Sequence, residues 1–328
     1  MQAKARAFPF PMPNGWFTVG YSSDLAPGQV VGLRYFATDL VLYRSEAGAA
    51  RVLDAFCPHL GANIGRGGKV EGDTIRCPFH GWRFGADGVC VEIPYAQRIP
   101  PKARLGSWPL LERNGAIWVW RHAEGKPPEW DVPEIPEFSS SDWTEPDFYR
   151  WQVRTRNQEM AENAVDKAHF RFVHGTMNVP ESVVTVDGVW RRSLNHSKML
   201  TPRGPVDGCI DANSFGFGCG FTRFTGICET VLMASTTPID EESCDVRFAF
   251  TQRKENGQKP VGGVGAAIIR DIVKQLNEDI PIWENKKYLE RPVLCDGDGP
   301  IAEFRRWCLQ FYSPEVRPGA EGAHAVQR

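Results

Sequence analysis

The sequence of 328 residues lacks several features that would place it in common protein classes. No apolar run approaches the roughly 18 residues that span a bilayer, so no transmembrane segment is expected. The 38 basic residues nearly balance the 40 acidic ones, which argues against binding nucleic acid by neutralising its phosphates. Nine cysteines are an odd number without regular spacing, and the first residues do not resemble a signal peptide. We therefore expect a cytoplasmic protein with reduced thiols.

Motifs that bind common electron donors are also missing. The C-x₄-C-x₂-C spacing of plant-type ferredoxins does not occur. Gly262–Gly265 comes nearest to the G-x-G-x-x-G of dinucleotide-binding folds, but it lacks the third glycine and follows no apolar strand. If this chain carries out redox chemistry, its electrons must come from another protein.

What the chain does contain is a pair of short motifs, Cys57-Pro58-His59 and Cys77-Pro78-Phe79-His80, with seventeen residues between them. Two thiolates and two imidazoles form the ligand set of a Rieske [2Fe–2S] centre, in which histidines replace cysteines on one iron. Zinc is the alternative, but the single residue inside the first pair is unlike the usual zinc spacing. The motifs predict an electron-transfer cluster.

An electron carrier alone does not account for the length. High-potential Rieske proteins carry motifs that resemble C-T-H-L-G-C and C-P-C-H-G-S, and the extra cysteine of each motif forms a disulfide with the other. In this chain Ala62 and Phe79 occupy those two positions, so that disulfide cannot form. Some 200 residues follow the cluster motifs, enough for a second domain. We expect that domain to have its own function.

The pattern along the chain supports this division. Residues 15–125 read as short β-rich segments between turns, and a proline-rich stretch from 125 to 146 marks a boundary. Beyond it we expect a strand over 147–156, a helix over about 158–172, a β-rich stretch to about 252 and a helix over about 264–288. Residues 314–328 read as a flexible tail.

The first of these helices contains D-x-x-H-x-x-x-x-H, made by Asp166, His169 and His174. Asp166 and His169 share a helical face because they are three residues apart. The two histidines are five apart, which separates them by ~140° on a straight helix. They converge on one metal only if the helix distorts or ends, and Gly175 is a reasonable stop. An amphipathic helix with two incidental histidines is the alternative.

Two histidines and one carboxylate form the usual mononuclear iron site of oxygenases. In the second helix an apolar stripe runs along one face, with Asp279 at its edge, while Glu278 and Asp271 are expected to point away. Burying a carboxylate beside apolar residues is costly unless a partner compensates it. We therefore predict Asp279 as the third ligand. Glu284 also lies near the stripe, beyond Pro281, and a surface acid is the alternative for Asp279.

Together these motifs resemble the oxygenase component of Rieske non-haem iron oxygenases over nearly the whole chain. The resemblance implies an α+β fold, with a β-sandwich Rieske domain at 15–125 and a helix-grip (START-like) catalytic domain at 126–313, on which residues 1–14 pack. It implies that Cys57, His59, Cys77 and His80 bind the cluster, and that His169, His174 and Asp279 bind Fe(II).

The same resemblance implies a homotrimer in which Asp166 bridges His169 to His80 of the neighbouring subunit and carries electrons between the metals. Orienting His169 is a second role for Asp166, compatible with the first. Electrons from NAD(P)H would arrive through a separate reductase, with or without a ferredoxin. Basic residues near the cluster could meet an acidic partner, or could form a plain solvated face: Arg66, Lys69, Arg76 and Arg83.

Further segments resemble the steroid-directed branch, which holds 3-ketosteroid 9α-hydroxylases and cholesterol 7-desaturases. We therefore expect a terminal oxygenase that uses O₂ to hydroxylate or desaturate a ring carbon of a steroid or sterol. The alternatives are another substrate class (sterol demethylation, aromatic or pyrrole oxidation) and a non-catalytic electron carrier. Phenylalanines in 209–233 fit either an apolar pocket or ordinary sheet core. The branch-like segments are Glu92–Ala96, Gly106–Pro109, Asp279–Tyr288 and Phe304–Tyr312.

Overall fold

The computed structural model describes residues 8–175, 182–201, 204–260 and 263–313. By its internal contacts the chain divides into two units. The N-terminal unit is Trp16–Glu134, and the C-terminal unit comprises the described residues of Met1–Gly15 and Ile135–Arg328. The domain limits predicted from the sequence stay a prediction, and the predicted tail lies outside the described residues.

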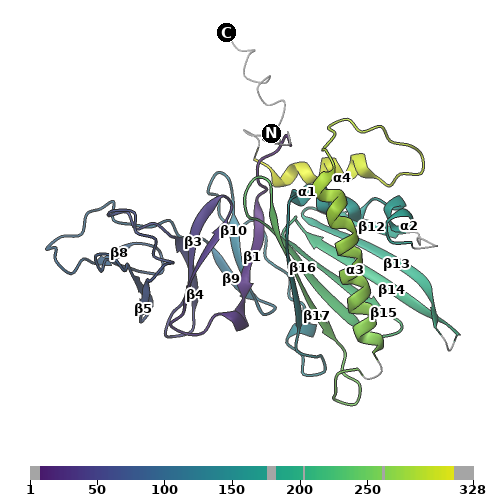
Figure 1. Cartoon of the computed structure of the whole chain (residues 1–328), viewed down its shortest axis with the longest axis horizontal. Helices are drawn as coiled ribbons and strands as arrows, with labels where there is room; N and C mark the ends of the chain where they lie inside the picture. Colours follow the sequence, from purple (N-terminus) through teal and green to yellow (C-terminus); the bar gives the residue numbers. More distant parts are fainter. Residues whose placement is uncertain (1–7, 176–181, 202–203, 261–262, 314–328) are drawn as a thin grey trace, which may run out of the picture. The chain divides into compact units, whose positions relative to one another are not determined.

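The N-terminal unit is built from three small antiparallel sheets (Figure 1). Two sheets of three strands, β1-β10-β9 and β2-β3-β4, form the sandwich, and the third has the order β5-β6-β7-β8. The strands are β1 (Gly15–Tyr21), β2 (Val30–Tyr35), β3 (Thr38–Arg44), β4 (Ala50–Asp54), β5 (Lys69–Glu71), β6 (Thr74–Arg76), β7 (Arg83–Phe84), β8 (Cys90–Glu92), β9 (Leu110–Arg113) and β10 (Ala116–Arg121).

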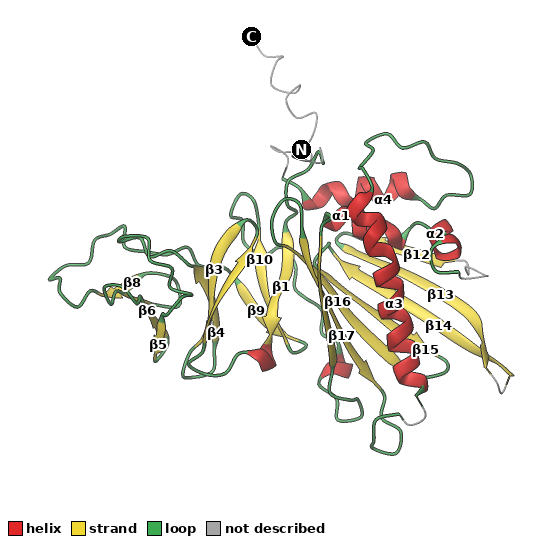
Figure 2. Ribbon diagram, viewed as in Figure 1, coloured by secondary structure: helices red, strands yellow, loops and turns green. Residues whose placement is uncertain are grey.

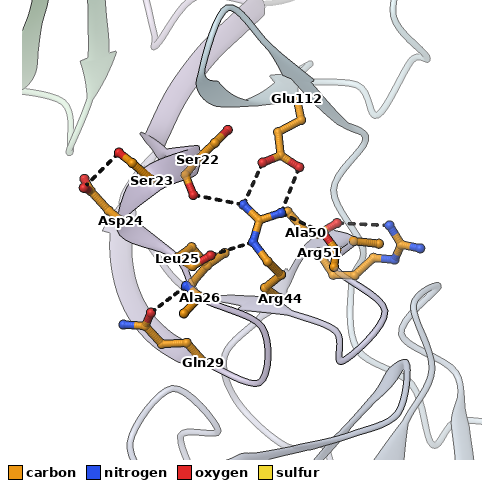
Figure 3. Close-up of polar contacts among 12 residues, drawn as sticks. Ser22, Ser23, Asp24, Leu25, Ala26, Gln29, Arg44, Ala50, Arg51 and Glu112 are labelled. Carbon is orange, nitrogen blue, oxygen red and sulfur yellow. Dashed lines mark hydrogen bonds and ion pairs between the residues drawn. The ribbon is translucent and has the colours of Figure 1, made fainter. Parts of the chain in front are cut away.

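A buried arginine joins the sandwich sheets of this unit (Figure 3). The guanidinium of Arg44, at the end of β3, binds both carboxylate oxygens of Glu112 on β9, at 2.6 and 3.1 Å. It also donates to the carbonyls of Ser22, Leu25 and Gly48. A buried charge is tolerated when its donors are satisfied in this way, so Arg44 ties two loops to two sheets.

The C-terminal unit is one antiparallel sheet with helices on one face (Figure 2). Its strand order is β11-β17-β16-β15-β14-β13-β12, so six consecutive strands form a meander and β11 pairs with the last of them. The strands are β11 (Asp147–Val153), β12 (Ser182–Asp187), β13 (Trp190–Thr201), β14 (Gly204–Phe215), β15 (Cys219–Thr225), β16 (Thr230–Pro238) and β17 (Cys244–Gln252). The helices are α1 (Asn157–Ala161), α2 (Ala168–Phe172), α3 (Val264–Asn285) and α4 (Ile301–Cys308).

The 22-residue helix α3 lies across the sheet through its apolar stripe. Leu276 and Trp283 pack with Val153 and Val246, and Ile269 packs with Phe250 and Leu232. Burying such side chains contributes about 1.5–3 kcal/mol each, which fixes the rotation of the helix about its axis. That rotation also decides where the acidic residues of α3 point.

The predicted fold class is confirmed, with mostly antiparallel sheets and few helices. The helix predicted over 158–172 is wrong as a single element: α1 passes into a 3₁₀ turn at Glu162–Ala164, and α2 begins only at Ala168. The helix predicted over 264–288 ends slightly earlier, at Asn285. Helix α4 was not predicted. Among the described residues, no helix combines the length and hydrophobicity that a membrane span requires.

Candidate metal centres and cavity

The loops that begin at Cys57 and Cys77 share one backbone pattern. The N–H of each cysteine donates to the carbonyl five residues on, Cys57 to Ala62 at 2.9 Å and Cys77 to Trp82 at 2.8 Å. The glycine four residues after each cysteine donates its N–H back to the cysteine carbonyl. Both glycines have positive φ, 74° and 72°, which a residue with a Cβ adopts at a cost. The shared pattern gives both loops the same tight turn after the cysteine.

The two loops bring the predicted cluster residues together in pairs, Cys57 beside Cys77 and His59 beside His80. Both cysteines are 3% exposed, and the ring centres of His59 and His80 are 4.6 Å apart. Trp82 stacks on His59 at 4.7 Å and donates its indole N–H to the hydroxyl of Tyr95. Burial raises the pKa of Cys57 to about 11, so a thiolate there requires a nearby positive charge. A pair of thiols and a pair of imidazoles on neighbouring loops suit a [2Fe–2S] cluster.

Two of the four basic residues noted near the cluster are already paired. Arg76 binds Glu71 at 2.6 Å, and Arg83 binds Glu92 at 2.7 Å. Arg66 and Lys69 are exposed. The local charge is therefore less positive than the sequence alone indicates.

The second predicted metal site lies wholly within the C-terminal unit. Ligand atoms of His169, His174 and Asp279 all lie within 4.8 Å of one another. The Nε2 atom of His174 is 3.4 Å from an Asp279 carboxylate oxygen, and the two imidazole centres are 5.2 Å apart. A cation fits this donor set well, because two neutral imidazoles and one carboxylate are typical iron ligands.

The two histidines converge because the helix between them is short. Helix α2 ends at Phe172, and Gly175 has a φ of 70°, so the chain turns before a full second helical turn is complete. His174 is thereby freed from the ~140° separation of a straight helix. The sequence allowed His169 and His174 to converge only if the helix distorted or ended between them, and it does end there.

Asp166 holds His169 in one orientation. Its backbone carbonyl lies 2.6 Å from Nδ1 of His169, which leaves Nε2 for a metal. Its side-chain oxygen accepts hydrogen bonds from the N–H groups of Ala168 and His169, at 3.1 and 3.3 Å. Asp166 therefore organises the start of α2 as well as the imidazole.

Glu278 corrects the sequence analysis, which expected its side chain to point away from the site. A carboxylate oxygen of Glu278 lies 3.0 Å from Nδ1 of His174. The reason is that His174 lies beyond the end of α2, where its two ring nitrogens face the consecutive residues Glu278 and Asp279 of α3. This hydrogen bond lowers the pKa of Glu278. In the sequence, the only indication that Glu278 lies at the site is its position directly before Asp279.

Asp279 is 8% exposed on α3. Burial raises the pKa of its carboxyl, while His174, His169 and a hydrogen bond from Asn163 act in the opposite direction. Asn163 in turn accepts a hydrogen bond from the indole of Trp283 at 3.3 Å. Glu284, the other acid near the stripe, instead accepts from the N–H of Arg154 at 3.2 Å.

A cavity of about 390 Å³ opens beside this triad, between α3 and the sheet. This volume is within the range of pockets for small organic ligands. One row of paired strand residues forms much of its floor, because side chains on alternate residues face the same side of a sheet. Small residues in the middle of that row leave the space open. The row, in strand order, is Arg191, Ser214, Gly220, Ala234 and Phe248.

The phenylalanines in 209–233 contribute less to this cavity than a pocket interpretation requires. Phe217 lines it. Phe215 and Phe221 stack on each other at 6.1 Å, and Phe224 packs against the Leu232, Phe250 and Ile269 core. Most of these phenylalanines therefore belong to the ordinary core of the sheet.

Comparison with known protein families gives two matches. Residues 15–109 match the Rieske [2Fe-2S] domain, and residues 119–312 match the 3-ketosteroid 9alpha-hydroxylase C-terminal domain. Together the two matches cover most of the chain.

Individual relatives show the same pattern. The chain is 32% identical to a 3-ketosteroid-9-alpha-monooxygenase oxygenase component of Rhodococcus rhodochrous, over 91% of this chain and 82% of that one. It is 34% identical to a cholesterol 7-desaturase of Xenopus laevis, over 94% and 74%. Dicamba monooxygenase, with 19% identity and a TM-score of 0.72 over 92% of this chain and 98% of that one, shares the fold.

Proposed function

This chain belongs to the Rieske oxygenases whose catalytic domain is that of the 3-ketosteroid 9α-hydroxylases, and on that premise we propose that it hydroxylates or desaturates a ring carbon of a steroid or sterol. It is an oxidoreductase and the oxygenase component of its system. The observation that carries the proposal is the cavity, which a two-histidine, one-aspartate triad lines together with mainly uncharged side chains.

Each predicted site residue has a proposed role. Cys57 and Cys77 hold one iron of the cluster, and His59 and His80 hold the other. His169, His174 and Asp279 hold a mononuclear Fe(II), which when bound would supply the site where O₂ is activated with electrons from the cluster.

The residues around the triad act by position. The carbonyl of Asp166 and the carboxylate of Glu278 each engage the Nδ1 atom of one imidazole, which would leave both Nε2 atoms to hold the metal. The Asn163 amide constrains the Asp279 carboxylate. The apolar cavity wall would hold a flat hydrocarbon skeleton near the metal and keep water away from it.

The partners are proposals as well. Electrons would come from NAD(P)H through a separate reductase, with or without a ferredoxin, and the enzyme would work as a homotrimer. Asp166 would then bridge His169 to His80 of the next subunit. The seven cysteines outside the cluster motifs, all within the described residues, form no disulfide and are mostly buried, which suits a reducing cytoplasm.

Iron and sulfide analysis with turnover tests this proposal. We expect three irons to two sulfides, a Rieske spectrum, and conversion of 3-ketosteroids or sterols when a reductase and O₂ are supplied. His169→Ala should lower the ratio to two irons per two sulfides, keep the cluster spectrum and abolish oxygenation. A wild-type ratio of two to two after reconstitution with iron would instead indicate an electron carrier.

A further inference from the structure

Among the described residues that line the cavity, Arg191 is the only lysine or arginine. It lies on β13, one residue after the start of the strand, and pairs with Ser214 in the row that forms the cavity floor. The residue is 6% exposed. A full positive charge is therefore held inside a mainly apolar chamber that also contains the metal triad.

The other buried arginines have carboxylate partners. Among the described residues, Arg44 binds Glu112 at 2.6 Å and Arg247 binds Asp245 at 2.9 Å. Within that same part of the chain, the guanidinium of Arg191 has no hydrogen bond or ion pair to any protein acceptor. Its guanidinium carbon lies 5.7 Å from the centre of the Phe304 ring.

The neighbouring residue, Arg192, does have a carboxylate partner within the protein. Arg192 points to the opposite face of the strand and binds Asp211 through two hydrogen bonds, at 2.7 and 2.9 Å. Two consecutive arginines thus differ in one respect: the outer one is neutralised by the protein, and the inner one is not.

A buried unpaired charge is unfavourable, because desolvation costs more than one aromatic ring returns. Burial accordingly lowers the pKa of Arg191. A ring ketone could accept a hydrogen bond from the guanidinium but would leave the charge uncompensated. A carboxylate would both neutralise it and accept two parallel N–H groups.

We propose that the substrate carries a carboxylate on its apolar body and that Arg191 receives this group in the cavity. The inference rests on the proposed function, because it takes the cavity to be the steroid site. It assigns Arg191 to substrate selection: acids are preferred over neutral compounds with the same skeleton.

Equilibrium binding by calorimetry on the anaerobic, metal-loaded enzyme tests this directly. The probes are a 3-ketosteroid whose side chain ends in a carboxylate, 3-oxocholenoic acid, and its methyl ester. We expect the acid to bind about tenfold more tightly than the ester, or better, because a hydrogen-bonded charge pair replaces a neutral contact. Equal affinities in the wild-type enzyme would overturn the inference without any variant.

Three variants locate the effect. Arg191→Met should remove the preference for the acid while changing ester affinity less than about threefold, and Arg191→Lys should keep part of the preference. Arg192→Met, the same change on the other face, should leave the preference intact. Weakening of acid and ester by the same factor in Arg191→Met would show a packing role and overturn the proposal.

Melting of the ligand-free protein separates the roles further. Arg191→Met should leave Tm unchanged or raise it, since it removes an uncompensated buried charge, whereas a purely structural arginine would lower Tm when lost. Turnover distinguishes the two proposals: conversion of the ester without preference for the acid would overturn the role of Arg191 alone. If the enzyme neither binds nor converts either steroid, both the steroid function and the role of Arg191 are overturned.

Discussion

A carboxylate oxygen of Glu278 lies 3.0 Å from Nδ1 of His174, although 104 positions separate the two residues in the chain. Glu278 immediately precedes Asp279, so consecutive residues of α3 meet the same histidine from two sides. One carboxylate approaches Nε2 at 3.4 Å and the other binds the opposite nitrogen. In the proposed iron site, this helix would supply one ligand, Asp279, and the group that orients another, His174.

We expect Glu278→Ala to weaken binding of the mononuclear iron by about 10- to 100-fold, because the imidazole loses the partner that fixes its tautomer. Titration of apo-protein with Fe(II) would measure this, and the cluster spectrum should not change. Asp271→Ala is the matched control, since that carboxylate is on the exposed side of α3 and binds only Gln275 among the residues described. Unchanged affinity in Glu278→Ala would contradict an orienting role.

Asp166→Asn should retain both metals but slow transfer of electrons from the cluster to the mononuclear iron by about 10- to 100-fold. Asparagine keeps a side-chain oxygen for the N–H groups of Ala168 and His169, so α2 should still form. Stopped-flow oxidation of the reduced cluster measures the rate, with Lys167→Gln as an exposed neighbouring control. Near-normal turnover in Asp166→Asn would rule out the bridge.

Ala234→Leu should fill part of the cavity floor and weaken steroid binding about tenfold or more, because added methylene groups in a packed site cost about 1–3 kcal/mol. Iron and sulfide content should stay at wild-type levels. The same change at Ala267, exposed on α3, serves as control. If both variants bind steroid equally well, the substrate does not lie over this row.

Glu112→Gln should destabilise the N-terminal unit by about 2 kcal/mol near neutral pH, because Arg44 would keep its carbonyl contacts but lose its counter-charge. The hydrogen bond from Arg44 lowers the pKa of Glu112 from its usual 4.5. Its contribution is therefore complete above that value and is lost as pH falls through the lowered folded-state pKa.

Denaturant unfolding of wild type and variant over this pH range measures the difference, which should shrink toward acid pH. Glu46→Gln, at an exposed position of the same unit, is the control. A difference that does not depend on pH would mean that the charge of Glu112 does not matter.

The helices show how far local pattern reaches. The apolar stripe of α3 predicted both its length and the position of Asp279, because helical periodicity is a property of neighbouring residues. The interruption between α1 and α2 was missed, since Glu162–Ala164 carries no proline or glycine to break the helix. There the surrounding structure overrides local preference.

The cavity shows the opposite case. Ser214, Gly220 and Ala234 are unremarkable in sequence, and only the strand register places them in one row. The phenylalanines in 209–233 suggest a pocket when the sequence is read alone, yet most of them pack outside the cavity. Register depends on pairing between distant segments, so no short-range pattern reveals it.

The sequence by itself determined the chemistry that this protein can perform. Donor type and spacing predict a cluster at the two Cys/His motifs and a metal site at the two histidines, because metal preference depends on the ligand atoms themselves. Tertiary structure alone decided that α2 stops in time for His169 and His174 to converge, that Glu278 reaches His174, and that Arg191 is buried without a carboxylate partner among the described residues. Distances and desolvation arise only when segments far apart in the chain pack together.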